Sequence, residues 1–355
     1  MKFLQVGSFD VVQCELGWPW ITIDATRSRF AFPAEGDRIA SRSFVEGDLA
    51  EGPTFALPSD LRLPKEKAPE VGHRGAEAGV HGFAIDPTGE RLALVGTVEG
   101  SSVVAILGPD GEKSRSRIDA LAGGDFVAHA VAFDRTGSRL WISAESAEET
   151  AMLLVDVTSL AVIGVVRSAP FPRPAFHELY IHAQDDAVLL VAACGPDGTF
   201  ARVVGFADGP PIAIANALEK GSISAGFVGF SSDGARVHLV EADELRTHSW
   251  PGLEELSSVD LADDFASSYA GAVLGDRIFI DGENRDTGDG DAVMQFDRTA
   301  IRGTLLKPPV PTGMWVGRIG LDAILTVDAR ISRPGTADQI EPSRGSVVRL
   351  PAPHN

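Results

Sequence analysis

Three histidines at a constant spacing are the residues best suited to chemistry. His81, His129 and His177 are 48 residues apart, and each opens a similar stretch of sequence. If neighbouring structural units place them together, three imidazoles would meet at one ion, with metal–nitrogen distances of about 2.0–2.1 Å. The spacing therefore predicts a divalent-metal site formed by these three residues. The alternative is that each histidine is a structural hydrogen-bonding residue, because duplication of an ancestral unit copies both kinds equally.

Two charged residues extend this set toward catalysis. Glu178 follows the third histidine directly, and Arg318 lies near the start of the last unit. With His177 they would form a catalytic set in which Glu178 transfers a proton and Arg318 holds an anion. Cys194 has no identifiable base, and no nucleophile elbow, phosphate-binding glycine loop or HExxH motif occurs.

Acidic and aromatic residues favour ligand binding near the histidines. Glu145 belongs to an acidic stretch, and Asp281 opens the densest one, residues 281–291. Oxygen-rich loops can hold Ca²⁺, but the spacing of an EF-hand is absent. Trp20 and Trp315 stand beside expected strand starts, where aromatic surface supports binding and core packing is the alternative. Glu145, Asp281, Trp20 and Trp315 are therefore predicted to bind a ligand.

The elements that must position these residues repeat along the chain. Residues 81–95 read HGFAIDPTGERLALV, two apolar runs joined by a turn-forming tetrad, and residues 129–143 and 177–191 resemble them. An apolar residue opens the second strand of each unit, at Phe30, Leu92, Leu140, Val188, Val237, Ile278 and Ile324. Seven units at this period predict an all-β, seven-bladed β-propeller with four-stranded blades.

The blades are expected to start near residues 19, 81, 129, 177, 226, 269 and 316, all within a single domain of residues 1–355. The last unit lacks one strand, and the N-terminus has one to spare, at residues 2–6 or 11–16. We therefore expect the N-terminal strand to complete the last blade and close the ring, because an open sheet edge invites aggregation. Residues 62–80 are expected to form an exposed loop.

Composition limits the class of partner. The formal net charge of −19 argues against binding to nucleic acid or to an anionic membrane surface. With only two cysteines and no long apolar run, a cytoplasmic protein is expected. Its basic residues are mostly Arg, which, with abundant Ala and Gly, indicates a bacterial source.

The segments PTGERLALV, RTGSRLWIS and SDGARVHLV resemble the repeats of bacterial YVTN and lactonase-like β-propellers, which belong to a WD40-like superfamily. That resemblance implies a β-propeller fold. The members of this superfamily include both enzymes and binding scaffolds. Because no complete catalytic motif occurs, we expect a scaffold that binds a peptide, protein or small ligand on an acidic channel face bearing His and Trp. The alternative is a lactone hydrolase, lyase or isomerase in the channel mouth, with a divalent metal as its cofactor.

Overall fold

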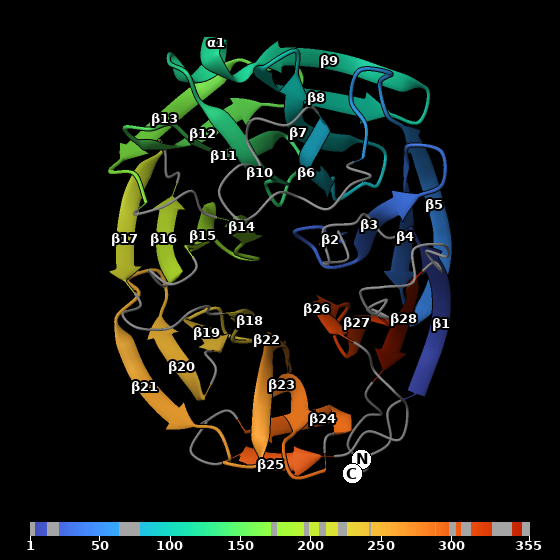
Figure 1. The fold of residues 1–355 in the computed structure, drawn as a ribbon, viewed down its shortest axis with the longest axis vertical. Helices are drawn as coiled ribbons and strands as arrows, with labels where there is room; N and C mark the ends of the chain where they lie inside the picture. Colours follow the sequence, from blue (N-terminus) through green and yellow to red (C-terminus); the bar gives the residue numbers. More distant parts are fainter. Residues whose placement is uncertain are drawn as a thin grey trace, which may run out of the picture. The chain divides into compact units, whose positions relative to one another are not determined.

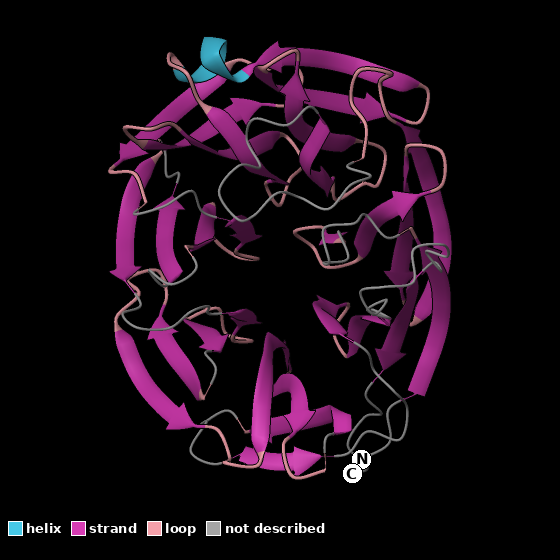
Figure 2. Cartoon of the chain, viewed as in Figure 1, coloured by secondary structure: helices cyan, strands magenta, loops and turns pink. Residues whose placement is uncertain are grey.

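β-Strands make up nearly all of the regular structure (Figure 2). The structure is a computed structural model. It describes residues 4–12, 21–63, 79–171, 176–194, 199–205, 211–218, 226–240, 243–287, 289–297, 303–306, 314–328 and 343–349. Within these ranges the strands form seven antiparallel sheets of four strands each, and α1 (Ile118–Ala122) is the one helix. No described helix has the length and apolar character needed to cross a membrane.

Four sheets are consecutive along the first two thirds of the chain. Blade one contains β2 (Thr22–Ile23), β3 (Arg29–Ala34), β4 (Arg38–Val45) and β5 (Asp48–Ala56); blade two contains β6 (Gly79–Ile85), β7 (Leu92–Val98), β8 (Ser101–Gly108) and β9 (Gly111–Arg117). Blade three contains β10 (Val127–Phe133), β11 (Arg139–Glu145), β12 (Thr150–Asp156) and β13 (Val162–Ser168); blade four contains β14 (Phe176–Ile181), β15 (Ala187–Ala193), β16 (Thr199–Gly205) and β17 (Ile212–Leu218).

Three further sheets follow. Blade five contains β18 (Gly226–Phe230), β19 (Arg236–Val240), β20 (Glu244–Ser249) and β21 (Glu255–Asp260). Blade six contains β22 (Phe265–Leu274), β23 (Arg277–Asn284), β24 (Asp289–Phe296) and β25 (Gly303–Leu306). Blade seven contains β26 (Met314–Ile319), β27 (Ala323–Asp328), β28 (Ser343–Arg349) and β1 (Leu4–Val11).

The predicted seven-bladed β-propeller is confirmed, and so is the role of the N-terminal strand. β1 pairs with β28 over its whole length, from Leu4 opposite Arg349 to Val11 opposite Ser343, so the two ends of the chain share one sheet (Figure 1). Each residue predicted to open a second strand lies there and is no more than 2% exposed, namely Phe30, Leu92, Leu140, Val188, Val237, Ile278 and Ile324.

Contacts divide the chain into two compact units. The N-terminal unit comprises Cys14–Ser43 and Ala50–Ile223. The C-terminal unit comprises Met1–Gln13, Phe44–Leu49 and Ser224–Asn355. The expectation of a single domain therefore stays a prediction.

Within each unit the core is a series of apolar layers between successive sheets. One layer joins blades two and three through side chains such as Val104 and Leu140, and α1 adds Ile118 and Ala122 to it. Another joins blades five and six through side chains such as Val228 and Ile280. Because successive side chains of a strand point to opposite faces of the sheet, such layers can cover both faces of a blade.

The first hairpin of a blade is held by the polar residue that follows its first strand. Asp134 accepts hydrogen bonds through Oδ1 from the backbone N–H groups of Ser138 (3.0 Å) and Arg139 (3.2 Å). Asp24 and Asp86 make the equivalent bonds in blades one and two. In blade four the ring Nδ1 of His182 accepts instead, from the N–H groups of residues 184 and 185. The turn tetrads are thus architectural.

Arginines beside these hairpins connect one blade to the next within the N-terminal unit. Arg29 donates to the carbonyl oxygen of Pro87 (2.9 Å), and Arg91 donates to that of Gly137 (2.8 Å). Arg91 also donates through Nε and Nη2 to Asp86, whose side chain is fully buried. The guanidinium therefore neutralises a buried carboxylate and links blades two and three at the same time.

We expect Arg91→Met to lower the free energy of unfolding by about 1–3 kcal/mol, because it removes a charged partner from a buried acceptor. Urea denaturation followed by circular dichroism measures this. Arg117→Met is the matched control, since Arg117 and Asp119 form an exposed ion pair whose loss changes stability by about 0–1 kcal/mol. Equal effects of both substitutions would contradict a linking role for Arg91.

Residues 62–80 and 281–291 were both expected to be loops. Residues 64–78 of the expected exposed loop lie outside the described residues; at its ends Leu63 is buried and Val80 donates from its backbone to Arg62 O (3.0 Å). The acidic stretch 281–291 is mainly strand, because Asn284 pairs with Asp289 and leaves only residues 285–288 between β23 and β24. Hydrogen bonds from Ser268 and Trp315 to Asp281 explain why its carboxylate is buried.

Candidate functional site

Two of the three repeated histidines lie together at one end of blades three and four. The rings of His129 and His177 are 4.7 Å apart between centroids. The carboxylate of Glu145 faces both, with Oε2 at 3.8 Å from His129 Nε2 and 3.7 Å from His177 Nε2. On its other side His177 Nδ1 hydrogen-bonds Ser143 Oγ at 3.1 Å. We call His129, Ser143, Glu145 and His177 the imidazole–carboxylate cluster.

Strand register explains why equally spaced histidines differ in environment. His129 is the extra residue of a β-bulge, because Ala128 pairs with Ala144 and Ala130 with Ser143. His177 pairs regularly with Ala192. A bulge re-aims the side chain that it carries. The His129 side chain accordingly stays 15% exposed, whereas that of His177 is 0% exposed.

His81 also occupies a β-bulge but makes a different contact. Its Nδ1 hydrogen-bonds the carbonyl oxygen of Ala128 on the neighbouring inner strand (3.1 Å). Gly82 allows this approach, since a Cβ there would lie 3.1 Å from His129 O. In the described ranges, no three His, Cys, Asp or Glu side chains are arranged to hold a metal ion. The three-histidine metal site therefore stays a prediction.

Burial keeps His177 neutral. Desolvation holds its pKa well below the usual value, and the positive charges of His129 and Arg202 act in the same direction. Nε2 of His177 has no hydrogen-bond partner, because its distance to Glu145 exceeds hydrogen-bonding range. The imidazole thus presents a buried polar atom toward a carboxylate that it does not reach.

Arg202 and Phe171 support the rear of the cluster. The guanidinium of Arg202 stacks on the ring of Phe171 (4.4 Å), and this ring meets the edge of His177 (5.3 Å). Arg202 also donates to Ser168 Oγ and Ala169 O, which join blades four and three. Burial lowers the pKa of Arg202, while attraction to Glu145 opposes this shift. Phe171 follows β13 and Arg202 lies in β16, so no local sequence signal identifies them.

The predicted catalytic residues do not form one described group. Glu178 follows His177 on β14, and successive strand residues point to opposite faces. Its carboxylate accepts a hydrogen bond from Tyr180 OH (2.8 Å), and burial raises the pKa of Glu178. Arg318 belongs to β26 of the C-terminal unit. The joint acid/base role of His177, Glu178 and Arg318 stays a prediction.

The other predicted ligand-binding residues have structural contacts. Trp315 is buried, and its backbone N–H donates to Asp281 Oδ2 (3.3 Å), linking blades seven and six. Trp20 lies outside the described residues. Of the three that the structure describes, Glu145 alone combines a polar cluster with partial exposure, at 10% of its side chain.

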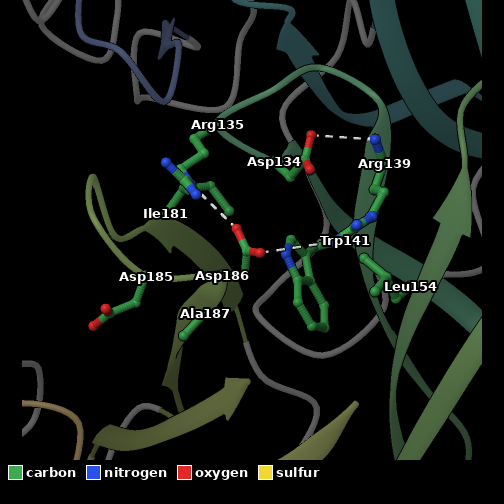
Figure 3. Close-up of a pocket in the computed structure, with 9 residues that line it drawn as sticks. All are labelled: Asp134, Arg135, Arg139, Trp141, Leu154, Ile181, Asp185, Asp186 and Ala187. Carbon is green, nitrogen blue, oxygen red and sulfur yellow. Dashed lines mark hydrogen bonds and ion pairs between the residues drawn. The ribbon is translucent and has the colours of Figure 1, made fainter. Parts of the chain in front are cut away.

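A small hollow lies at the opposite, hairpin end of blades three and four (Figure 3). Arg135 Nε contacts Asp186 Oδ1 at 3.1 Å, and Arg139 Nη1 lies 3.9 Å from the other oxygen. Buried Trp141 forms part of the lining. Because two arginines of blade three contact an aspartate of blade four, this hollow lies at a junction between these two sheets.

Comparison with known proteins supports the fold. The chain has the fold of a β-propeller. It is similar to the β-propeller domain of Cps50 (Swd1) from Myceliophteria thermophila, with a TM-score of 0.55 and 10% identity, over 98% of this chain and 100% of that domain. Solved chains that match number 1094, so the fold alone does not narrow the function. No model of a protein family and no curated protein matches the sequence.

Proposed function

We propose that this protein is a binding scaffold whose imidazole–carboxylate cluster receives a hydrogen-bond donor group, the ammonium or guanidinium of a basic peptide. The observation that supports this most is the convergence of two imidazole Nε2 atoms on Glu145 Oε2, at 3.7 and 3.8 Å. Polar atoms at such separations are commonly bridged by a third group. Glu145 and His129, whose side chains stay 10% and 15% exposed, are the members of the cluster that this group can reach.

Electrostatics supports a cationic ligand at longer range. The net charge is −19, and Glu148 and Glu149 stand in the loop directly after Glu145. Such a field raises the association rate of a positively charged partner. The guanidinium of Arg202 offsets part of the negative charge of Glu145. The donor group of the ligand is therefore held mainly by hydrogen bonds with directional geometry.

The enzyme alternative has one observation in its favour and one against it. Ser143, His177 and Glu145 follow one another as a hydroxyl, an imidazole and a carboxylate, the groups of a hydrolytic triad. Ser143, however, is 0% exposed in the middle of β11, so a substrate carbonyl has no access to its oxygen. Because the Ser143 hydroxyl is buried, a binding role is favoured over acyl transfer.

The test is a binding titration with a labelled peptide of alternating Lys and Gly, followed by fluorescence anisotropy. We expect Glu145→Gln to weaken binding about tenfold or more, the loss expected for a charge-assisted hydrogen bond. Glu148→Gln is the matched control, because it removes the same charge from an exposed position in the loop that follows β11. We expect less than about a twofold change there.

A peptide of alternating Glu and Gly is the specificity control. Equal binding of the two peptides, or equal affinities of the wild-type and Glu145→Gln proteins for the Lys peptide, would exclude the cluster as a site for basic ligands. Stoichiometric metal found in protein purified without a tag would instead favour the histidine metal site and the enzyme alternative.

A further inference from the structure

Arg318 occupies a position that is apolar in every other blade. In each sheet one residue of the first strand pairs with the residue that opens the apolar run of the second strand. These residues are Ile23, Ile85, Phe133, Ile181, Phe230 and Val273 in blades one to six. In blade seven the residue opposite Ile324 is Arg318. A cation therefore replaces a side chain of the apolar layers.

Among the described residues, Arg318 makes one hydrogen bond through its side chain, and its Nε has no partner. Nη1 donates to the carbonyl oxygen of Val273 at 3.5 Å, and Nε is buried without a hydrogen-bond partner. Within the described ranges no carboxylate forms an ion pair with it. The acids of the adjacent hairpins contact other residues, Asp322 with Arg349 and Asp276 with Ser232.

Two other partly buried arginines of this chain have charged or multiple partners. Arg91 contacts Asp86 and a backbone carbonyl, and Arg202 has two hydrogen bonds and a ring beneath it. Burial alone lowers the pKa of Arg318, with no opposing attraction from a described acid.

We propose that Arg318 binds an oxyanion, the carboxylate or phosphate group of a ligand, at the hairpin end of blades six and seven. An unpaired buried charge destabilises a fold unless a partner compensates it. The guanidinium fork matches the two oxygens of a carboxylate or phosphate. This site is independent of the proposed peptide site, because it uses other residues and the opposite ligand charge.

The first test compares stability without added oxyanion, in chloride buffer. Arg318→Met keeps an unbranched side chain and removes the charge, so we expect it to raise the urea midpoint. Arg285→Met is the matched control, because it removes an exposed arginine paired with Asp243 in the same unit, and we expect an unchanged midpoint. A lower midpoint for Arg318→Met would show a structural arginine and overturn the proposal.

The second test measures thermal stability at constant ionic strength as chloride is replaced by inorganic phosphate or by acetate. A ligand of the folded state raises the melting temperature in proportion to the logarithm of its concentration. We expect this rise in the wild type and in Arg285→Met, with the apparent dissociation constant about tenfold or more weaker in Arg318→Met. The anion with the larger effect identifies the ligand group. No response to either anion, or an equal response in Arg318→Met, would overturn the proposal.

Discussion

Deletion of residues 1–12 is expected to produce a protein that no longer unfolds in one cooperative transition. The deletion removes β1 and with it all the hydrogen bonds that β28 makes on that side. It also removes Phe9 and Val11, which are buried. The newly open edge of β28 carries Val347 and Val348, so we expect aggregation as well. Circular dichroism in urea and light scattering measure the two effects.

A single substitution isolates the packing part of this effect. The ring of Phe9 lies against Gly345, where an added Cβ would approach the ring to 2.2 Å. Phe9→Ala should lower the free energy of unfolding by about 3–5 kcal/mol, a large share of a typical total of 5–15 kcal/mol. Leu4→Ala on the same strand is the control, because Leu4 is 64% exposed and its loss should change stability by at most about 0.5 kcal/mol. An unchanged urea midpoint after the deletion would refute the closing role of β1.

The blade repeat was predictable because it rests on local chemistry. Each second strand opens with an apolar residue, each first hairpin needs a residue that accepts backbone N–H groups, and both recur in the sequence. Asp24 and His182 accept backbone hydrogen bonds as Asp86 does, although the residues around them in the sequence differ. An arginine precedes that apolar residue in blades one, two and three, but the sequence alone does not indicate its contact with the next blade.

The site was less predictable because it depends on register and on contacts between blades. A spacing of 48 residues suggested three equivalent histidines, yet bulges in β6 and β10 and a regular β14 place them differently. A one-residue change of register moves a side chain to the other face of a sheet. Glu145 was predicted to bind a ligand, but its position between two imidazoles follows only from the packing of blade three against blade four.

The stability of the protein should fall as the pH is lowered from about 7 to about 5, with buried histidines as the cause. His238 in β19 hydrogen-bonds Thr247 Oγ1 through Nδ1 (3.0 Å), and burial lowers its pKa to about 4. The positive charges of Arg236 and His248 act in the same direction, and Asp233 opposes them. His177 is shifted the same way. Below pH 6.5 the unfolded chain therefore binds protons that the folded chain does not accept.

The sign and window of the effect follow from these shifts. A histidine whose pKa is lowered by folding does not affect stability above pH 6.5, the pKa that it has in the unfolded chain. Below pH 6.5 it reduces the free energy of unfolding until the pH reaches its pKa in the folded protein, and for His238 this reduction is about 3 kcal/mol at pH 4. Asp24 and Glu178, whose pKa values are raised by burial, act oppositely at the acidic end. Urea titrations between pH 7.5 and 5 therefore report the histidines best.

His238→Asn separates this residue from the others, because the amide can replace the Nδ1 contact with Thr247 and does not titrate. We expect the variant to be somewhat less stable at pH 7.5, owing to lost packing, and to lose less stability than the wild type on acidification. The double variant with His177→Asn should flatten the profile further, since both groups bind their proton only after unfolding. Parallel pH profiles for the wild type and both variants would show that these two imidazoles are not the groups that couple folding to protons.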